Sequence, residues 1–571
     1  MKRTSPKAPH IAATISVLFS LLLLAGMFGQ SISFLADAST GAGTSLTTST
    51  PLTAHSPIRI DDDHEMTTLA STENWHGNGS VSNPYIIENL EVNATGSYNG
   101  IYIGNVSASF IIANCSVYGA ISADTDGYPY NYGAGIAACN DTGLITIRND
   151  LCDGNSEGIF VYGASSFLLE SNTCNNNDYD GINLYASKSG AIRDNICSGN
   201  ADTGIYLAGS SDGNSIIRNT CGVEGYGIYL TASAGNTIAN NICKTDGHGI
   251  LVAASHNSTV SDNTCQDSSL SGITLEMSNS SIVSGNTCSG SGYYGIFLDS
   301  SSNDTVTGSI CDSNKYYGIF LGGSNSNIVN NNICDSNSFY GIYLYSSWSN
   351  SITGNTCDYN VHYGIYLYSA SIDNTVSTNI CNGNTEVGIF LYSSGTGNTL
   401  FRNDCENNGH YGIYLYSANR TSIRENTCQI NGYYGIYLYN SSSYNTVMAN
   451  TCVKNAGAGI CLYLDCSNNT IGNNVCNGES DRGIYVLLDC SDNTFRNNTV
   501  LWNDQGISID ATSLRNVLSG NNVGSSSDDT GWVLTGIAIA AALVVLAAAL
   551  SAKRKKNKKK GTERRSRRSR K

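Results

Sequence analysis

A Gly-Ile pair returns along most of the chain at an almost constant interval. After a first interval of 35 residues, the spacing is 22, 23 or 24 residues through to Gly506. Residues 341–363 read GIYLYSSWSNSITGNTCDYNVHY, and residues 412–434 read GIYLYSANRTSIRENTCQINGYY. A repeat of this length is one supersecondary unit, which buries its apolar face only when neighbouring copies stack on it.

Each repeat contains short alternating stretches separated by Gly, Asn and Ser. In residues 365–368, a period of two places Ile365 and Leu367 on one face and Tyr366 and Tyr368 on the other. No stretch within a repeat is long or periodic enough for a helix. Three short strands per turn, stacked in register, predict an all-β, right-handed parallel β-helix of about 17–18 coils.

Composition supports this fold over its rivals. The chain has 60 Gly and only 6 Pro, and no Pro lies beyond position 129. Gly- and Asn-rich segments of this length are poor helix formers. A leucine-rich repeat has an overlapping period, but it needs an L-x-x-L-x-L pattern and more Leu than these repeats contain.

Cysteine occupies one position of the repeat. We expect these residues to form a buried thiol ladder, with oxidation of some adjacent pairs or binding of a soft metal as alternatives. Cys466 and Cys490 lie outside this column and could pair across coils. An Asn two positions before most column Cys predicts a ladder of amides that satisfies turn backbone. The column contains Cys115, Cys152, Cys174, Cys197, Cys221, Cys243, Cys265, Cys288, Cys311, Cys334, Cys357, Cys381, Cys405, Cys428, Cys452 and Cys476.

The two ends of the chain predict export and membrane anchoring. Residues 1–38 read as a signal peptide, with an uncleaved anchor as the alternative. Residues 532–550 carry no charge and are long enough to cross a bilayer, and the basic residues 551–571 follow them. The positive-inside rule then places this tail in the cytoplasm and the body outside a single-pass cell-membrane anchor. Between the ends we predict a linker (39–57), a cap with first coils (58–134), the main repeats (135–518) and a second linker (519–531).

Charge is distributed unevenly along the chain. Residues 553–571 hold 13 of the 30 Lys and Arg, whereas positions 8–552 hold 14 basic residues against 44 acidic ones. Affinity for nucleic acid depends on Lys and Arg that neutralise phosphates, so we expect no nucleic-acid partner for the acidic body. The basic tail is more simply explained by anionic lipid beside the predicted span.

Outward-facing aromatic residues form the main candidate binding surface. They lie two and four positions after the repeat glycine, and both positions are aromatic over several consecutive coils. A strip of this kind indicates a binding surface, and Tyr suits sugar rings because its ring is apolar and its tip forms hydrogen bonds. The alternatives are that the rings only stabilise adjacent strands or that loops cover the strip. The candidate ligand-binding residues are Tyr343, Tyr345, Tyr366, Tyr368, Phe390, Tyr392, Tyr414, Tyr416, Tyr437 and Tyr439.

Two polar columns are candidate reactive groups. Asp312, Asp335 and Asp358 follow the column Cys in three successive coils, and close carboxylates are the groups used in glycoside hydrolysis or in binding Ca²⁺. The ordinary explanation is that Asp is a turn residue. His362, Glu386 and His410 form a second column, which could hold a metal ion or act as an acid and base. Chance placement in a column that otherwise holds Tyr316, Phe339 and Tyr433 is the simpler explanation.

The block from residue 58 to Cys115 contains NPYIIE, NGIYI and FIIANC, and the G-I-Y-L and N-T-I-x-x-N repeats follow it. With these motifs the chain resembles right-handed parallel β-helix repeat proteins of the NosD-like type over about residues 58–525. The resemblance implies an exported or surface protein of archaeal or bacterial type, related to carbohydrate-binding and sugar-hydrolase domains. Such proteins are named for copper-site maturation. The chain has only 5 Met and 8 His, without a His/Met cluster by sequence, so its residues do not themselves predict copper.

The sequence therefore leaves three hypotheses about function. The first is a membrane-anchored surface protein that binds or adheres to an extracellular polysaccharide or glycoprotein through the Tyr strip. The second is a polysaccharide hydrolase or lyase that uses the Asp column, although basic residues for a lyase are scarce. The third is a structural rod of the cell envelope.

Overall fold

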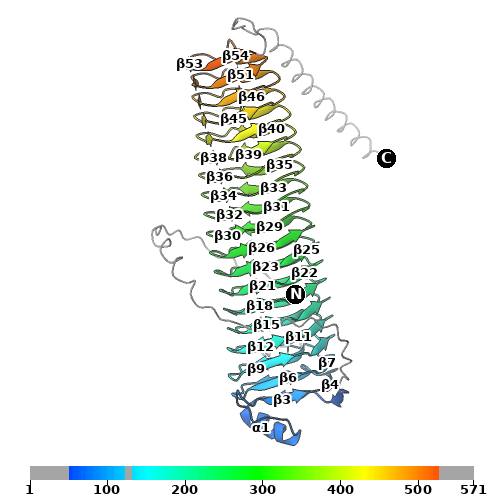
Figure 1. The fold of residues 1–571 in the computed structure, drawn as a ribbon. Coiled ribbons are helices and arrows are strands. Elements are labelled where there is room, and N and C mark those ends of the chain that lie inside the picture. Colours follow the sequence, from blue (N-terminus) through cyan, green and yellow to red (C-terminus); the bar gives the residue numbers. More distant parts are fainter. Residues whose placement is uncertain (1–50, 123–131, 526–571) are drawn as a thin grey trace, which may run out of the picture. The chain divides into compact units, whose positions relative to one another are not determined.

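The structure, a computed structural model, describes residues 51–122 and 132–525. In these residues, 54 strands and one helix wind into a parallel β-solenoid. Each strand pairs in parallel with the equivalent strand of the next coil, so strands of one sheet stack along the axis (Figure 1). The predicted right-handed parallel β-helix is confirmed for these residues.

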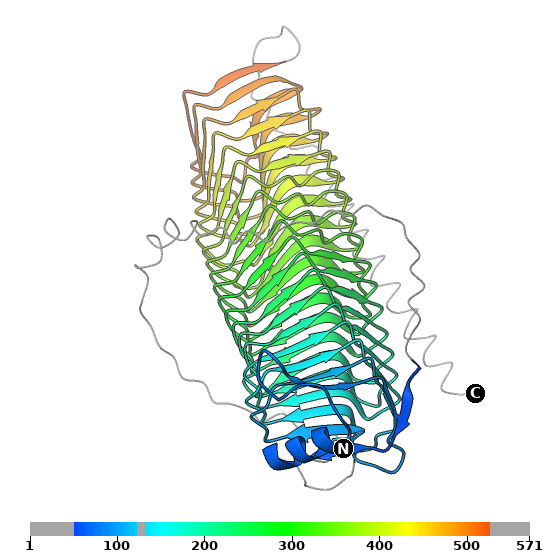
Figure 2. The same cartoon turned by 60° about the horizontal axis from the view of Figure 1, so that its bottom comes forward.

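Three sheets, named A, B and C, form the sides of every coil (Figure 2). Sheet A runs from β1 (Thr53–His55) to β28 (Thr287–Ser289), and then from β39 (Asp404–Glu406) to β54 (Asn522–Ser525). Sheet C runs from β3 (Tyr85–Glu88) to β53 (Val517–Ser519). Sheet B contains β2 (Ile58–Ile60), β5 (Ile101–Gly104), β8 (Ala134–Cys139), β11 (Glu157–Tyr162), β14 (Asp180–Tyr185), β17 (Thr203–Ala208), β20 (Tyr226–Thr231), β23 (His248–Ala253), β26 (Ser271–Glu276), β29 (Tyr294–Asp299), β31 (Tyr317–Gly322), β33 (Tyr340–Tyr345), β35 (Tyr363–Tyr368), β37 (Val387–Tyr392), β40 (Tyr411–Tyr416), β43 (Tyr434–Tyr439), β46 (Ala458–Tyr463), β49 (Arg482–Leu487) and β52 (Gln505–Ile509).

Sheet B contains 19 strands, so the solenoid has slightly more coils than predicted. The additional coil begins with β2, which pairs with β5 although it lacks the Gly-Ile pair. β1 and β54 lie inside the two segments predicted as linkers. Pairing with a neighbouring coil, which the repeat count does not detect, extends the solenoid at both ends.

The core is filled by Ile, Leu, Val and Cys from all three sheets. In β35, Ile365 and Leu367 are fully buried, as the alternation predicts. Cys152 to Cys476 form the predicted column, since Cys152 pairs with Cys174 and equivalent pairs follow. Every one of the 20 cysteines is buried, and none forms a disulfide within the described residues. Burial raises the pKa of the Cys428 thiol well above its ordinary value, which keeps this thiol protonated.

Cys115 does not belong to this column, so that assignment was wrong. Cys152 pairs with Val117, and Val117 occupies the core position in β7 (Ser116–Tyr118). The Cys115 N–H instead donates to Asp150 Oδ1 at 2.7 Å, which places Cys115 at the preceding corner. The column therefore has Val at its N-terminal end as well as at Val500.

Asparagine ladders close the corners of the coils. The Asn355 N–H donates to Asn379 Oδ1 at 2.9 Å, and Asn355 Nδ2 donates to the Val329 carbonyl at 2.9 Å. The same pattern repeats from Asn172 to Asn498, except at Ser309, where a hydroxyl takes the place of the amide. Because these groups are buried, each amide satisfies turn backbone that would otherwise lack a partner.

One helix, which the repeat pattern did not predict, covers the N-terminal end of the solenoid. α1 (Asp63–Thr72) begins after Asp62, whose side chain accepts from the Glu65 N–H at 2.8 Å. Met66 is fully buried against the core. An acidic N-cap followed three residues later by Glu is a helix-start signal, so the run at residues 61–65 begins a cap.

Among the described residues, no helix combines the length and apolar character needed to cross a bilayer. The predicted signal peptide, the predicted span at 532–550 and the basic tail all lie outside the described residues.

Candidate functional site

The outer face of sheet B carries aromatic side chains in four columns, which we call the aromatic face. Relative to the glycine that begins each repeat, they stand at positions −2, −1, +2 and +4. The sequence predicted the last two columns but not the column at −1. Its aromatic members are Tyr226, Tyr294, Tyr317, Tyr340, Tyr363, Tyr411 and Tyr434.

The +2 column is a continuous stack of rings along the axis. Phe320 and Tyr343 have ring centroids 5.0 Å apart with an interplanar angle of 10°, and Tyr343 and Tyr366 follow at 5.2 Å and 11°. The stack continues through Phe390 and Tyr414, whose centroids lie 4.5 Å apart at 4°. Ring faces in this column therefore contact other rings, and the ring edges and hydroxyl groups are left for solvent or a ligand.

Beside it, the −1 column stacks from Tyr294 to Tyr363 and again between Tyr411 and Tyr434, with Val387 between the two runs. Tyr340 and Tyr363 have centroids 5.0 Å apart and are inclined by only 3°. Between the columns, Tyr340 meets Tyr366 edge-to-face at 5.0 Å and 63°. Such contacts contribute roughly 0.5–1.5 kcal/mol per pair beyond burial. The two columns thus form one rigid aromatic layer.

The predicted strip consists of an inner and an outer column. At +2, Tyr343 is only 9% exposed because its neighbours cover it, whereas Tyr345 at +4 is 43% exposed. The +4 column is also less regular, since Tyr345 and Tyr368 are tilted by 41°. The predicted inner residues are Tyr343, Tyr366, Phe390, Tyr414 and Tyr437, and the predicted outer residues are Tyr345, Tyr368, Tyr392, Tyr416 and Tyr439.

Burial keeps the phenol groups neutral. It raises the pKa of Tyr411 to about 12, and burial together with the nearby Glu386 carboxylate raises the pKa of Tyr340 to about 12. At neutral pH these side chains therefore remain hydrogen-bond donors as well as acceptors.

The His and Glu column at position −2 is brought together only in part. His362 Nδ1 and Glu386 Oε1 lie 2.6 Å apart, at the border of the aromatic face. His410 instead packs beside Tyr433, with ring centroids 5.4 Å apart. No group of three or more His, Cys, Asp or Glu in residues 51–122 and 132–525 is arranged to hold a metal ion.

The Asp column lies on sheet A, away from the aromatic face. The Asp335 N–H donates to Asp312 Oδ1 at 3.0 Å, and the Asp358 N–H donates to Asp335 Oδ1 at 2.7 Å. In these coils sheet A pairs only through isolated bridges, such as Ile333 with Thr356. Burial raises the pKa of Asp312, Asp335 and Asp358. The three carboxylates therefore connect neighbouring coils.

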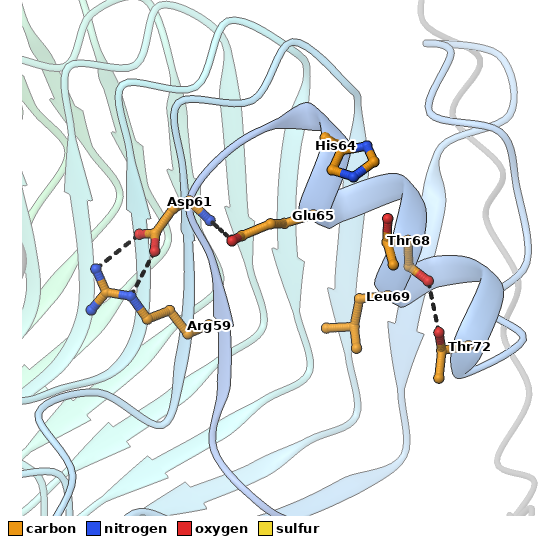
Figure 3. Close-up of a pocket in the computed structure, with 7 residues that line it drawn as sticks. All are labelled: Arg59, Asp61, His64, Glu65, Thr68, Leu69 and Thr72. Carbon is orange, nitrogen blue, oxygen red and sulfur yellow. Dashed lines mark hydrogen bonds and ion pairs between the residues drawn. The ribbon is translucent and has the colours of Figure 1, made fainter.

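A separate pocket of about 420 Å³ lies beside α1 (Figure 3). The charged side chains that line this pocket form hydrogen bonds and an ion pair with one another or with the neighbouring backbone. Arg59 Nε donates to Asp61 Oδ2 at 2.8 Å, and the Asp61 N–H donates to Glu65 Oε2 at 2.7 Å. The Arg59 guanidinium also lies 5.2 Å from the centre of the Tyr102 ring. These contacts fix the cap in place. The pocket is lined by Arg59, Asp61, His64, Glu65, Thr68, Leu69 and Thr72.

Comparison with protein families gives two matches. The family described as "Periplasmic copper-binding protein (NosD)" matches residues 76–255 and 223–386, which together cover more than half of the chain. The family described as "Right handed beta helix region" matches residues 395–541. No curated protein matches the chain.

Several solved structures are similar to the chain. The periplasmic alginate epimerase AlgG is 12% identical, with a TM-score of 0.28 over 81% of this chain and 88% of that chain. The A-module of the mannuronan C-5 epimerase AlgE4 from Azotobacter vinelandii is 13% identical, with a TM-score of 0.31 over 63% and 94%. A DFA-IIIase from Arthrobacter chlorophenolicus is 13% identical, with a TM-score of 0.34 over 52% and 94%.

Proposed function

The chain belongs to the NosD family of right-handed parallel β-helix repeat proteins. Within this fold, we propose a function for the aromatic face of sheet B. That function is binding of a polysaccharide or the glycan of a glycoprotein along the aromatic face. The observation that carries the proposal is the unbroken stack of rings at the +2 column from Phe297 to Tyr437.

The spacing of the rings suits a polymer that lies parallel to the axis. Neighbouring rings recur about every 5 Å, such as 5.1 Å between Tyr366 and Phe390, and the sugar units of an extended polysaccharide repeat on a similar scale. Tyr hydroxyls at the ring tips can bond to sugar hydroxyls, while the more exposed +4 rings provide apolar surface. A rigid surface loses little entropy when it binds.

The charge of the protein limits the class of polymer. The body between positions 8 and 552 holds 44 acidic and 14 basic residues. An acidic polymer would be repelled unless cations such as Ca²⁺ lay between the two. We therefore propose a neutral or weakly charged glycan, held by a protein whose residues 532–550 anchor it at the outer face of the cell membrane.

The hydrolase alternative receives less support. Asp335 and Asp358 each use a backbone N–H of their own coil to bind the preceding Asp carboxylate. This contact gives the Asp column a structural role in joining coils.

Copper, which the family description implies, does not fit the described residues. The Cys column is fully buried, and burial raises the pKa of members such as Cys428, whereas copper binds thiolate. His362 has a carboxylate partner but no second His beside it. No step of the proposed function therefore involves copper.

The outer tyrosines provide the test. The triple variant Tyr345→Ala, Tyr368→Ala and Tyr392→Ala should bind the glycan about a hundredfold more weakly, at roughly 1 kcal/mol per ring. Affinity is measured by isothermal titration with the purified protein. A matched control replaces Tyr359 and Tyr444, which are exposed but lie outside the four columns. Unchanged affinity in the triple variant would contradict the proposal.

A further inference from the structure

The two ends of the solenoid differ in how their cores are covered. At the N-terminal end, α1 places Met66 over the core. At the other end, the last coil consists of β52, β53 and β54 (Figure 1). Leu518 pairs with the fully buried Phe495, and Val523 pairs with the fully buried Val500.

In this last coil the core positions are open. Leu518 and Val523 are each 49% exposed, and no described residue covers them. Trp502 in the preceding coil is 65% exposed, and Leu514 and Val517 of the last coil are exposed as well. A solenoid normally ends in a repeat with a polar outer face, because an open apolar end promotes association. We therefore expect another apolar surface to cover the C-terminal end of the solenoid.

The residues that follow the last coil indicate which apolar surface lies close enough to cover it. Residues 526–531 read SSDDTG, which is too short and too polar to cover an apolar surface. Fully extended, this segment spans about 20 Å. It leads to Trp532 and the uncharged residues 532–550, after which the basic tail follows.

We infer that the C-terminal end of the solenoid docks on the surface of the lipid bilayer, with Trp502, Leu514, Val517, Leu518 and Val523 in contact with the headgroup region. The inference rests on the proposed membrane anchor, because a span beginning at Trp532 holds this end within about 20 Å of the lipid. Trp and aliphatic side chains are suited to the interfacial region.

Docking in this way would also orient the aromatic face. The end face formed by the last coil is perpendicular to the direction in which the coils stack. Contact of this face with lipid would therefore hold the strands of sheet B stacked along the membrane normal. A glycan on the aromatic face would then extend away from the cell surface.

The four tryptophans allow a direct test with the full chain. Three variants each retain one of Trp348, Trp502 and Trp532, with the other three Trp replaced by Phe. Each is reconstituted into vesicles of phosphatidylcholine and phosphatidylglycerol, with and without brominated phosphatidylcholine, and Trp fluorescence is measured. Trp348 is the matched control, since it is exposed but lies seven coils, or roughly 30 Å, from the last coil.

We expect brominated lipid to quench Trp532 and Trp502 at least twofold and to leave Trp348 unchanged. Quenching of Trp532 alone would overturn the docking inference and leave the anchor standing. Absence of quenching at Trp532 would overturn the anchor and the inference together. If a single-Trp variant fails to fold, Trp502→Phe in the otherwise unchanged chain gives a second reading, because it should lower the quenchable share of the emission.

Discussion

At the scale of single residues, the corners of the coils depend on a buried side chain that both donates and accepts hydrogen bonds. Asn327 shows the arrangement, since its N–H donates to Asn350 Oδ1 at 2.8 Å and its Nδ2 donates to the Ser301 carbonyl at 3.0 Å. Asp304 occupies the equivalent place one coil earlier. Its Oδ1 accepts from the Ser281 N–H at 2.7 Å, but its buried Oδ2 has no partner.

Replacing Asp304 by Asn should stabilise the protein in a pH-dependent way. Burial raises the pKa of Asp304 to about 7 from an unfolded value near 4. The stability contributed by the neutral carboxyl is therefore present below about pH 4 and is lost as the pH rises to about 7. Asp304→Asn should raise the free energy of unfolding by roughly 2–4 kcal/mol at pH 8 and by much less at pH 4.

Chemical unfolding at both pH values measures this difference. Asp299→Asn, a change at a partly exposed position on sheet B, is the control for altered net charge. An equal gain at pH 4 and pH 8 would mean that the buried charge is not the cause. Asp150 and Glu479 share this behaviour, because burial raises the pKa of Asp150 to about 7 and that of Glu479 to about 8.

At the scale of elements, the repeat glycine changes the phase of each sheet B strand. A Cβ added at Gly364 would lie 2.7 Å from the Gly388 carbonyl oxygen and 2.9 Å from the Cys381 Cβ. The position therefore faces the core directly beside Ile365, which also faces the core. Two adjacent inward positions leave Tyr363 on the outer face, against a strict period of two.

Gly364→Ala should lower the free energy of unfolding by about 1–3 kcal/mol, because the added methyl group overpacks a site with no room to relax. Ser338→Ala, at an exposed position outside the strands, is the control and should change little. Chemical unfolding measures both. If Gly364→Ala is as stable as the control, the close approach of the coils does not require glycine.

This change of phase explains why the sequence predicted some of the outward columns and not others. The period of about 23 residues and the Ile and Leu alternation predicted the coils, the core and the outward +2 and +4 columns. The −1 column was missed because strict alternation places Tyr363 inside. Cys115 was assigned to the column by residue type alone, although its Asn stands one position before it and not two, and register with the next coil places Val117 in the column. Neither feature can be read from one repeat alone.

At the scale of the whole solenoid, the outer face of sheet B changes along the axis. In the first coils it is covered, since Tyr132 stacks on the fully buried Phe160 with ring centroids 4.1 Å apart. Farther along, the aromatic columns retain partly exposed members from β29 to β46. A ligand of several sugar units can therefore contact many coils at once, which favours a polymer over a small molecule.

Size-exclusion chromatography of neutral polysaccharides mixed with the purified protein, with and without Ca²⁺, tests the central claim most directly. We predict that one of these polymers co-elutes with the protein at unchanged chain length. Shortened polymer would contradict the binding account and support a hydrolase or lyase. Separate elution of every polymer and the protein would contradict glycan binding for that panel and favour a structural role in the envelope.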